Sequence, residues 1–92
     1  MGRCKKDRHC RRLRDERIFK PIGLPTRMLL MNEIEQDEFE AMRLCDMDNK
    51  NQMEAAEIMK ISRGTIQRLL CSGRAKLMEA ILNNKAIKIK NN

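Results

Sequence analysis

Two amphipathic segments joined by a three-residue turn constrain this chain more than any other feature. The first, Gln52–Met59, follows Asn51, which stands three residues before Glu54 in the spacing of a capping box. The second extends from Arg63 to about Leu82 without a proline, and Ser62 before it is a favoured N-cap. We therefore predict two helices, a short one and a long one, that cross closely at the turn.

The spacing of small and apolar residues in positions 52–71 has the layout of a helix-turn-helix. Such a unit needs a small residue inside its first helix and an apolar residue in the turn, which are supplied by Ala56 and Ile61. It also needs apolar anchors on the inner face of the second helix, where Ile66 and Leu69 are placed. The outer face of the second helix is then free to enter a DNA major groove.

The outer face of the second helix carries side chains that suit base edges and phosphates. The residues predicted to contact bases are Arg63, Gly64, Gln67 and Arg68. Arginine makes a bidentate contact with guanine, glutamine does the same with adenine, and glycine allows a close approach. The residues predicted to contact phosphates are Lys60, Ser62, Thr65, Arg74 and Lys76.

Other segments complete a mainly helical, all-α domain. A first helix is predicted from Gln36 to about Asp46, with the acids Asp37, Glu38 and Glu40 as its dipole-compensating surface. The buried stripe predicted for the long helix is Ile66, Leu69, Leu70, Gly73, Leu77, Ala80 and Ile81.

The two ends of the chain differ from this helical domain. Residues 1–17 contain almost no apolar side chain and are expected to form a basic flexible arm outside a single domain of residues 18–92. Residues 18–25 contain two prolines and are predicted to be extended. Phe19 and Ile22 are expected to pack against the domain and hold this segment to it. Residues 86–90 alternate apolar and charged side chains, as in a short edge strand. Its partner would be residues 18–20 or a second subunit.

The charge of the chain favours a polyanionic partner. The net charge is +7, and two basic segments flank an acidic one from Glu33 to Glu57. No apolar run is long enough to span a membrane, and no secretory signal is visible, so we expect a cytoplasmic protein with reduced thiols. Double-stranded DNA is the predicted partner, and a transcriptional regulator the predicted function.

These residues resemble a prokaryotic family known as domain of unknown function 134, whose members are described as predicted DNA-binding proteins. The matching residues are Phe19, Lys20, Pro21, Gly23, Pro25, the run from Asp37 to Leu44, Asp46, Gln52, Glu54, Ala55, Ala56, Met59, Ile61, Ser62, Arg63, Thr65, Ile66, Arg68, Leu69, Leu70, Arg74, Lys76, Lys85 and Ala86. The resemblance implies a helix-turn-helix similar to region 4 of sigma-70 factors. The chain departs from the family at Lys60 and Asn84, where glycine is usual, at Gly73, where alanine is usual, and at Ile18, where tyrosine is usual.

The cysteines and the single histidine do not indicate a metal site or an enzyme. Cys4 and Cys10 are too far apart in the sequence for a zinc-ligand pair. The positively charged Arg and Lys side chains around these cysteines and His9 also oppose the binding of a cation. Cys45 is expected in the core and Cys71 partly exposed on the second helix. No nucleophile and base stand at catalytic spacing, so we expect neither catalysis nor a cofactor.

Two other functions compete with DNA binding. The first is a protein-interaction module, resembling sigma region 4, that binds RNA polymerase or another regulator without contacting DNA. The second is RNA binding, which the scarcity of aromatic side chains for base stacking disfavours. If the chain does bind DNA, a homodimer is attractive because one helix-turn-helix recognises few bases.

Overall fold

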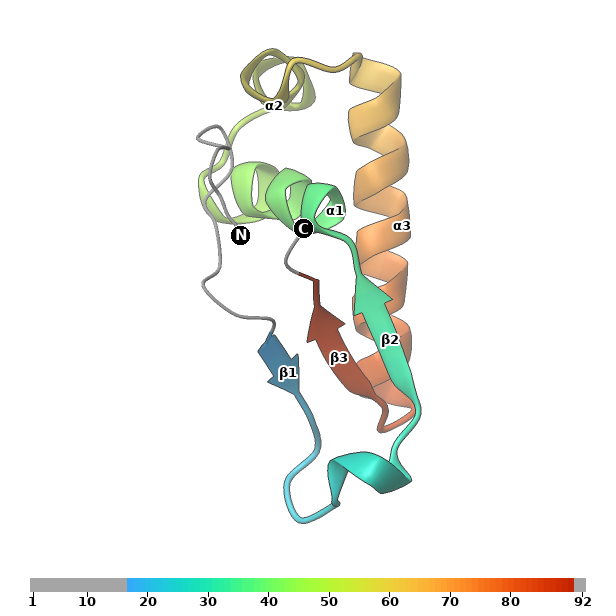
Figure 1. Cartoon of the computed structure of the whole chain (residues 1–92). Coiled ribbons are helices and arrows are strands. Elements are labelled where there is room, and N and C mark those ends of the chain that lie inside the picture. Colours follow the sequence, from blue (N-terminus) through green and yellow to red (C-terminus); the bar gives the residue numbers. More distant parts are fainter. Residues whose placement is uncertain (1–16, 91–92) are drawn as a thin grey trace, which may run out of the picture.

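The computed structural model describes residues 17–90, in which three helices pack beside one small sheet (Figure 1). The strands are β1 (Arg17–Phe19), β2 (Met31–Ile34) and β3 (Ala86–Ile89). The helices are α1 (Gln36–Met42), α2 (Gln52–Met59) and α3 (Arg63–Leu82). A 3-10 turn at Thr26–Met28 precedes β2, and a π-helical segment at Arg43–Met47 continues α1. The fold is therefore mainly helical, as predicted, with more strand than predicted.

The sheet has the order β1-β3-β2, and β3 is its central strand. β3 pairs antiparallel with β1, where Ile18 lies opposite Lys88, and parallel with β2, where Ile34 lies opposite Ile89. The predicted pairing with the segment near Ile18 is confirmed, although Arg17, assigned to the arm, is already part of β1. The prediction of an edge strand is wrong because β2 covers the other side of β3. Sequence reasoning missed β2, whose partner lies more than fifty residues away.

The starts of α2 and α3 are capped as the sequence predicts. The Asn51 side chain accepts the Glu54 backbone N–H at 2.8 Å, and the Glu54 carboxylate accepts the Asn51 N–H at 2.9 Å. Ser62 Oγ accepts the Thr65 N–H at 3.1 Å and caps α3. Lys60 ends α2 in the left-handed conformation, with φ 62°. These local bonds explain why the bounds of both helices could be predicted.

The core lies between the sheet and the three helices. Its largest fully buried apolar side chains are Ile34 from β2 and Ile66 and Leu70 from α3. Several alanines of the three helices are also nearly inaccessible: Ala41, Ala55, Ala56 and Ala80. α3 contacts α1, α2 and β2, so this one helix joins all the layers of the fold.

The predicted first helix runs to Met47 rather than to Asp46, but its last turn is wider than an α-helix. The Asp48 N–H bonds to the Arg43 carbonyl at 3.0 Å, five residues back, which is the π-helical pattern. Arg43 also holds this turn through its side chain, which binds the Glu40 carboxylate at 2.6 Å and Asp48 at 2.9 Å. The wide turn sets the position of Asp46 beside α3.

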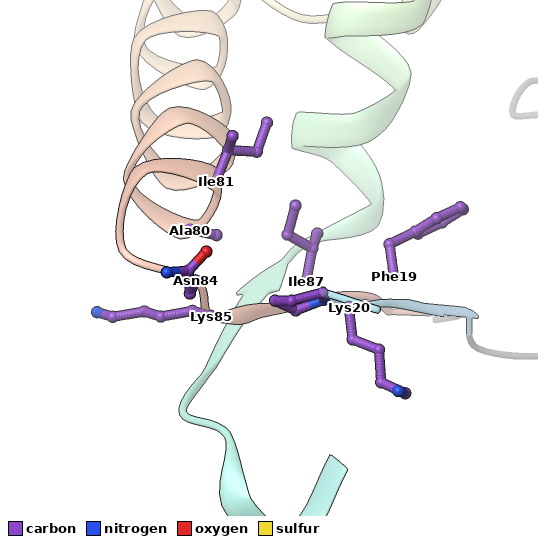
Figure 2. A pocket seen from close by; sticks show the side chains of 8 residues that line it. Phe19, Lys20, Ala80, Ile81, Asn84, Lys85 and Ile87 are labelled. Carbon is purple, nitrogen blue, oxygen red and sulfur yellow. The ribbon is translucent and has the colours of Figure 1, made fainter. Parts of the chain in front are cut away.

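Apolar side chains that the sequence predicted to pack against the domain lie exposed at the end of the molecule distant from α2. Ile81, predicted on the buried stripe of α3, is 59% exposed, and Phe19 is 57% exposed. Both border a groove of about 300 Å³ between β1 and the end of α3, with Ile87 between them (Figure 2). Ile22, predicted to pin its segment to the domain, is 97% exposed. The short β1 leaves this surface uncovered.

Candidate nucleic-acid interface

The connection between α2 and α3 leaves the first turns of α3 at one end of the molecule, close to α2 (Figure 1). The Ile61 N–H bonds to the Ala56 carbonyl at 3.0 Å, so the chain turns directly from one helix into the other. Ile61 packs against the core cluster while Lys60 and Ser62 on either side of it are exposed. The tight turn and the small side chain of Ala56 bring the two helices together.

All four residues predicted to contact bases lie exposed on one side of α3. Arg63 and Gln67 lie one helical turn apart, and so do Gly64 and Arg68 beside them. The opposite side of the same turns is anchored in the core by Ile66. No acid occurs in α3 before Glu79, so the exposed side of its first half is free of carboxylates of its own.

Hydrogen bonds hold the Arg68 guanidinium close to the start of α3. Arg68 Nη2 donates to the Thr65 hydroxyl at 3.2 Å, and the Thr65 and Ser62 hydroxyls lie 2.9 Å apart. A chain of three side chains thus connects the N-cap to the guanidinium. These bonds already restrict the side-chain conformations of Arg68, so less conformational entropy is lost when Arg68 binds a ligand.

The five residues predicted to contact phosphates fall into two groups. Lys60, Ser62 and Thr65 lie around the N-terminus of α3, where unpaired backbone N–H groups favour an anion. Arg74 and Lys76 lie further along the helix, and each binds a carboxylate of the same chain. Arg74 binds Asp46 at 2.6 Å, and Lys76 binds Glu38 at 2.8 Å.

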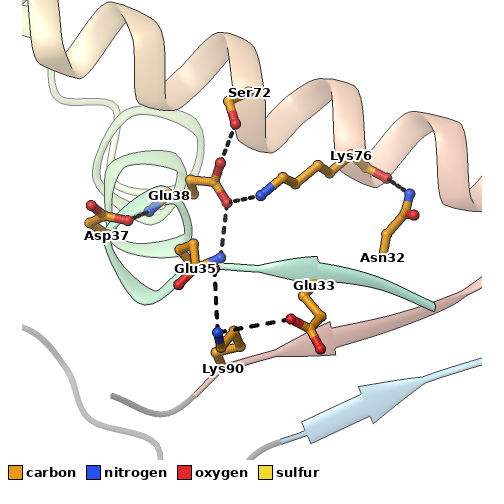
Figure 3. A network of polar contacts seen from close by, with 8 residues as sticks. All are labelled: Asn32, Glu33, Glu35, Asp37, Glu38, Ser72, Lys76 and Lys90. Carbon is orange, nitrogen blue, oxygen red and sulfur yellow. Dashed lines mark hydrogen bonds and ion pairs between the residues drawn. The ribbon is translucent and has the colours of Figure 1, made fainter.

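Glu38 is the centre of a polar network that joins α1 to α3 (Figure 3). Its carboxylate accepts hydrogen bonds from Lys76 Nζ, from the Ser72 hydroxyl and from the Glu35 backbone N–H. Burial raises the pKa of Glu38, but the hydrogen bonds from Lys76, Ser72 and Glu35 together lower it by more than burial raises it. The pKa of Glu38 therefore lies below its usual value. Glu38 is therefore ionised at neutral pH.

The network shows that the sequence assigned two acids of α1 to the wrong environment. Glu38 is only 4% exposed and Glu40 only 1%, although both were predicted on a solvated helix surface. The burial of the Glu40 carboxylate is compensated by the Arg43 guanidinium, which binds both of its oxygens, at 2.6 and 3.0 Å. Asp37 alone of the three is exposed, as predicted.

A bond from β2 fixes the same region of α3 from the other side. The Asn32 amide donates to the Lys76 backbone carbonyl at 3.0 Å and to the Glu79 carboxylate at 2.7 Å. Lys90, just after β3, lies 3.5 Å from Glu35 and 3.8 Å from Glu33. The Asn32 bonds attach α3 to β2, whereas the Lys90 contacts join the end of β3 to β2 and to the start of α1. Sequence reasoning missed Asn32 because it missed β2.

Comparison with known proteins identifies the family. The family model described as "Protein of unknown function DUF134" matches residues 1–92. The chain belongs to this family.

Relatives of this DUF134 chain carry the name UPF0251 protein. One from Dehalococcoides mccartyi is 43% identical over an alignment of 83 residues, and the match covers 87% of this chain and 71% of the relative. One from Shewanella pealeana is 40% identical over 87 residues, covering 95% of this chain and 91% of the relative. One from Halothermothrix orenii is 36% identical over 88 residues, covering 96% and 65%. No solved structure matches the chain significantly.

The cysteines that the structure describes in this DUF134 member lie near Arg74. Cys45 is half-buried, and burial together with the charge of Asp46 raises its pKa against the opposing effect of Arg74. Cys71 is exposed on the same side of α3 as Gln67. Cys4, His9 and Cys10 lie outside the described residues. Within residues 17–90, no group of three His, Cys, Asp or Glu side chains could hold a metal ion.

No helix within residues 17–90 combines the length and the apolar character that a membrane span requires.

Proposed function

We propose that this protein binds double-stranded DNA through a helix-turn-helix formed by α2, the turn at Lys60–Ser62 and α3. In this proposal the first half of α3 enters the major groove and the protein acts as a transcriptional regulator in the cytoplasm. The observation that carries the proposal is the exposed side of α3, where Arg63, Gln67 and Arg68 project from turns anchored by Ile66.

The chemistry of this side of α3 suits the base edges of a major groove. A guanidinium donates two parallel bonds to guanine, and a carboxamide pairs with the donor and acceptor of adenine. Gly64 presents no side chain: a Cβ there would meet only the end of Arg68 at 3.8 Å and Ser62 at 4.0 Å. The helix start is therefore free to approach a groove floor closely.

The cations and hydroxyls around the base-contacting residues fit the two phosphate backbones that border the groove. Lys60, Ser62 and Thr65 lie at the helix start, where backbone N–H groups add positive potential. The net charge of +7 further favours association with DNA of any sequence. Arg74 extends the same exposed side by two turns.

Fluorescence anisotropy with random-sequence duplex DNA across a salt series tests this proposal. We expect binding that weakens steeply with salt and that weakens further in the double variant Gln67→Ala, Arg68→Ala. Arg27→Ala is the matched control. Arg27 is also exposed, and its substitution removes the same charge from the 3-10 turn at the far end of the molecule. No binding at low salt, or equal losses in the control, would contradict the proposal.

A protein-interaction module is the second candidate, and the groove beside Phe19 and Ile81 favours it. A large exposed apolar surface often marks a protein contact. In this case the partner is RNA polymerase or another regulator, and DNA affinity is absent. Substitutions at Phe19 and Ile81, rather than at Arg68, would then remove the activity.

A further inference from the structure

Arg74 lies on the same exposed side of α3 as the residues proposed to contact DNA. It follows Arg63 by eleven residues and Gln67 by seven, which is close to a whole number of helical turns in both cases. A cation at this position is aligned with a phosphate backbone bordering the groove into which α3 is proposed to enter.

The Arg74 guanidinium is already bound at two points. Its Nη2 lies 2.6 Å from Asp46 Oδ1, and its Nε lies 3.2 Å from Asp46 Oδ2. This two-point geometry is the one in which a guanidinium also binds a phosphate. Asp46 therefore occupies the donor groups that a DNA phosphate would use.

The Asp46–Arg74 pair differs from the neighbouring pair in its access to solvent. The Arg74 and Asp46 side chains are 49% and 47% exposed, whereas the Glu38 side chain that binds Lys76 is only 6% exposed. An exposed ion pair contributes little to stability and exchanges partners readily. Lys76 is fixed as part of the structure, while Arg74 is able to change from one anion to another.

We propose that Asp46 is an internal competitor that holds Arg74 back from DNA phosphates and so limits the affinity for DNA of arbitrary sequence. This inference rests on the proposed function. A phosphate reaches Arg74 only by displacing the Asp46 carboxylate, and the displaced carboxylate then lies near a backbone of like charge. Both effects lower the affinity for random duplex DNA and reduce the number of phosphate contacts that the protein makes.

The substitution Asp46→Asn tests this proposal, because it removes the competing charge with little change in shape. One added phosphate contact increases the salt slope, −d log K/d log[salt], by about 0.9, which corresponds to about eightfold tighter binding near 0.1 M salt. Asp48→Asn is the matched control: it removes the same charge two residues away, from a carboxylate that binds Arg43 instead. Asp46→Ser provides a second variant with the same expected gain.

Binding of random-sequence duplex DNA is measured for wild type and for the single variants Asp46→Asn, Asp48→Asn and Arg74→Gln. It is also measured for the double variant that combines Asp46→Asn with Arg74→Gln. We expect a large gain for Asp46→Asn, a small one for Asp48→Asn, and none from Asp46→Asn once Arg74 is replaced. Equal gains in the two single variants, or a gain that persists without Arg74, would overturn the proposal. Wild-type protein that does not bind DNA at low salt would instead overturn the proposed function itself.

Discussion

The backbone of Gly73 in α3 lies directly against the side chain of Met42 in α1. A Cβ on Gly73 would stand 2.9 Å from Met42 Cε and 3.1 Å from Met42 Sδ, and 3.3 Å from the Cβ of Glu38. The sequence alone marks Gly73 as a weak point of the helix. In the structure, the missing side chain also lets α1 and α3 approach closely.

Gly73→Ala should therefore change stability by less than about 1 kcal/mol, because a gain in helix propensity of about 1 kcal/mol opposes crowding of similar size. When Met42 is first replaced by alanine, the crowding is relieved and Gly73→Ala should stabilise by about 1 kcal/mol. Chemical denaturation of the four proteins of this cycle measures the difference. Equal effects of Gly73→Ala in both backgrounds would show that Met42 is not the opposing contact.

Lys60→Gly should stabilise the fold by about 1 kcal/mol, since Lys60 adopts φ 62°, a conformation that costs a residue with a Cβ about that much. Asn84→Gly is the control: Asn84 has φ 57°, but asparagine tolerates this conformation better, so its gain should be smaller. Thermal unfolding followed by circular dichroism gives both values. A loss of stability in Lys60→Gly would mean that the lysine side chain contributes more than its backbone strain costs.

Glu38→Gln should destabilise the protein by about 2 kcal/mol at neutral pH, because it weakens charge-assisted bonds to a buried group. The pKa of Glu38 is lower in the folded state, so its contribution is complete above the unfolded pKa and is lost as pH falls through the folded value. The difference in stability between wild type and variant should therefore narrow from pH 6 toward pH 3. Glu57→Gln, at an exposed position of α2, should show a small difference at every pH. A difference for Glu38→Gln that does not change with pH would contradict this role.

Asn32→Ala should cost about 1–2 kcal/mol, because the two hydrogen bonds that attach β2 to α3 are lost. Asn83→Ala is the matched control, since Asn83 makes two bonds to Glu79 of its own helix but is exposed. Asn32→Asp should destabilise more at pH 7 than at pH 3, because the new carboxylate faces the ionised Glu79. Urea denaturation at both pH values compares the three variants, and equal losses at positions 32 and 83 would refute the proposed attachment.

The parts of the fold that the sequence predicts are those fixed by local interactions. The bounds of α2 and α3 follow from Asn51, Glu54 and Ser62, each of which bonds within three residues. Such signals are contained in a few neighbouring residues and need no knowledge of the tertiary structure.

The parts that the sequence does not predict depend on partners distant in the chain. β2 pairs with β3 across the whole helical segment, and Asn32 finds its partner Glu79 at a separation of 47 residues. The burial of Glu38 depends on Lys76 and Ser72 of α3, so periodicity within α1 could not indicate it. The same holds for the candidate site. The sequence predicts the exposed side of α3, but it does not predict the ion pair between Asp46 and Arg74.

Contact between DNA and the first half of α3 is tested by NMR mapping of backbone amide shifts with random-sequence duplex DNA at low salt. We expect the largest shifts in residues 60–71, with a smaller set around Asp46 and Arg74. Shifts concentrated instead near Phe19 and Ile81, or no shifts at all, would show that DNA does not bind through α3.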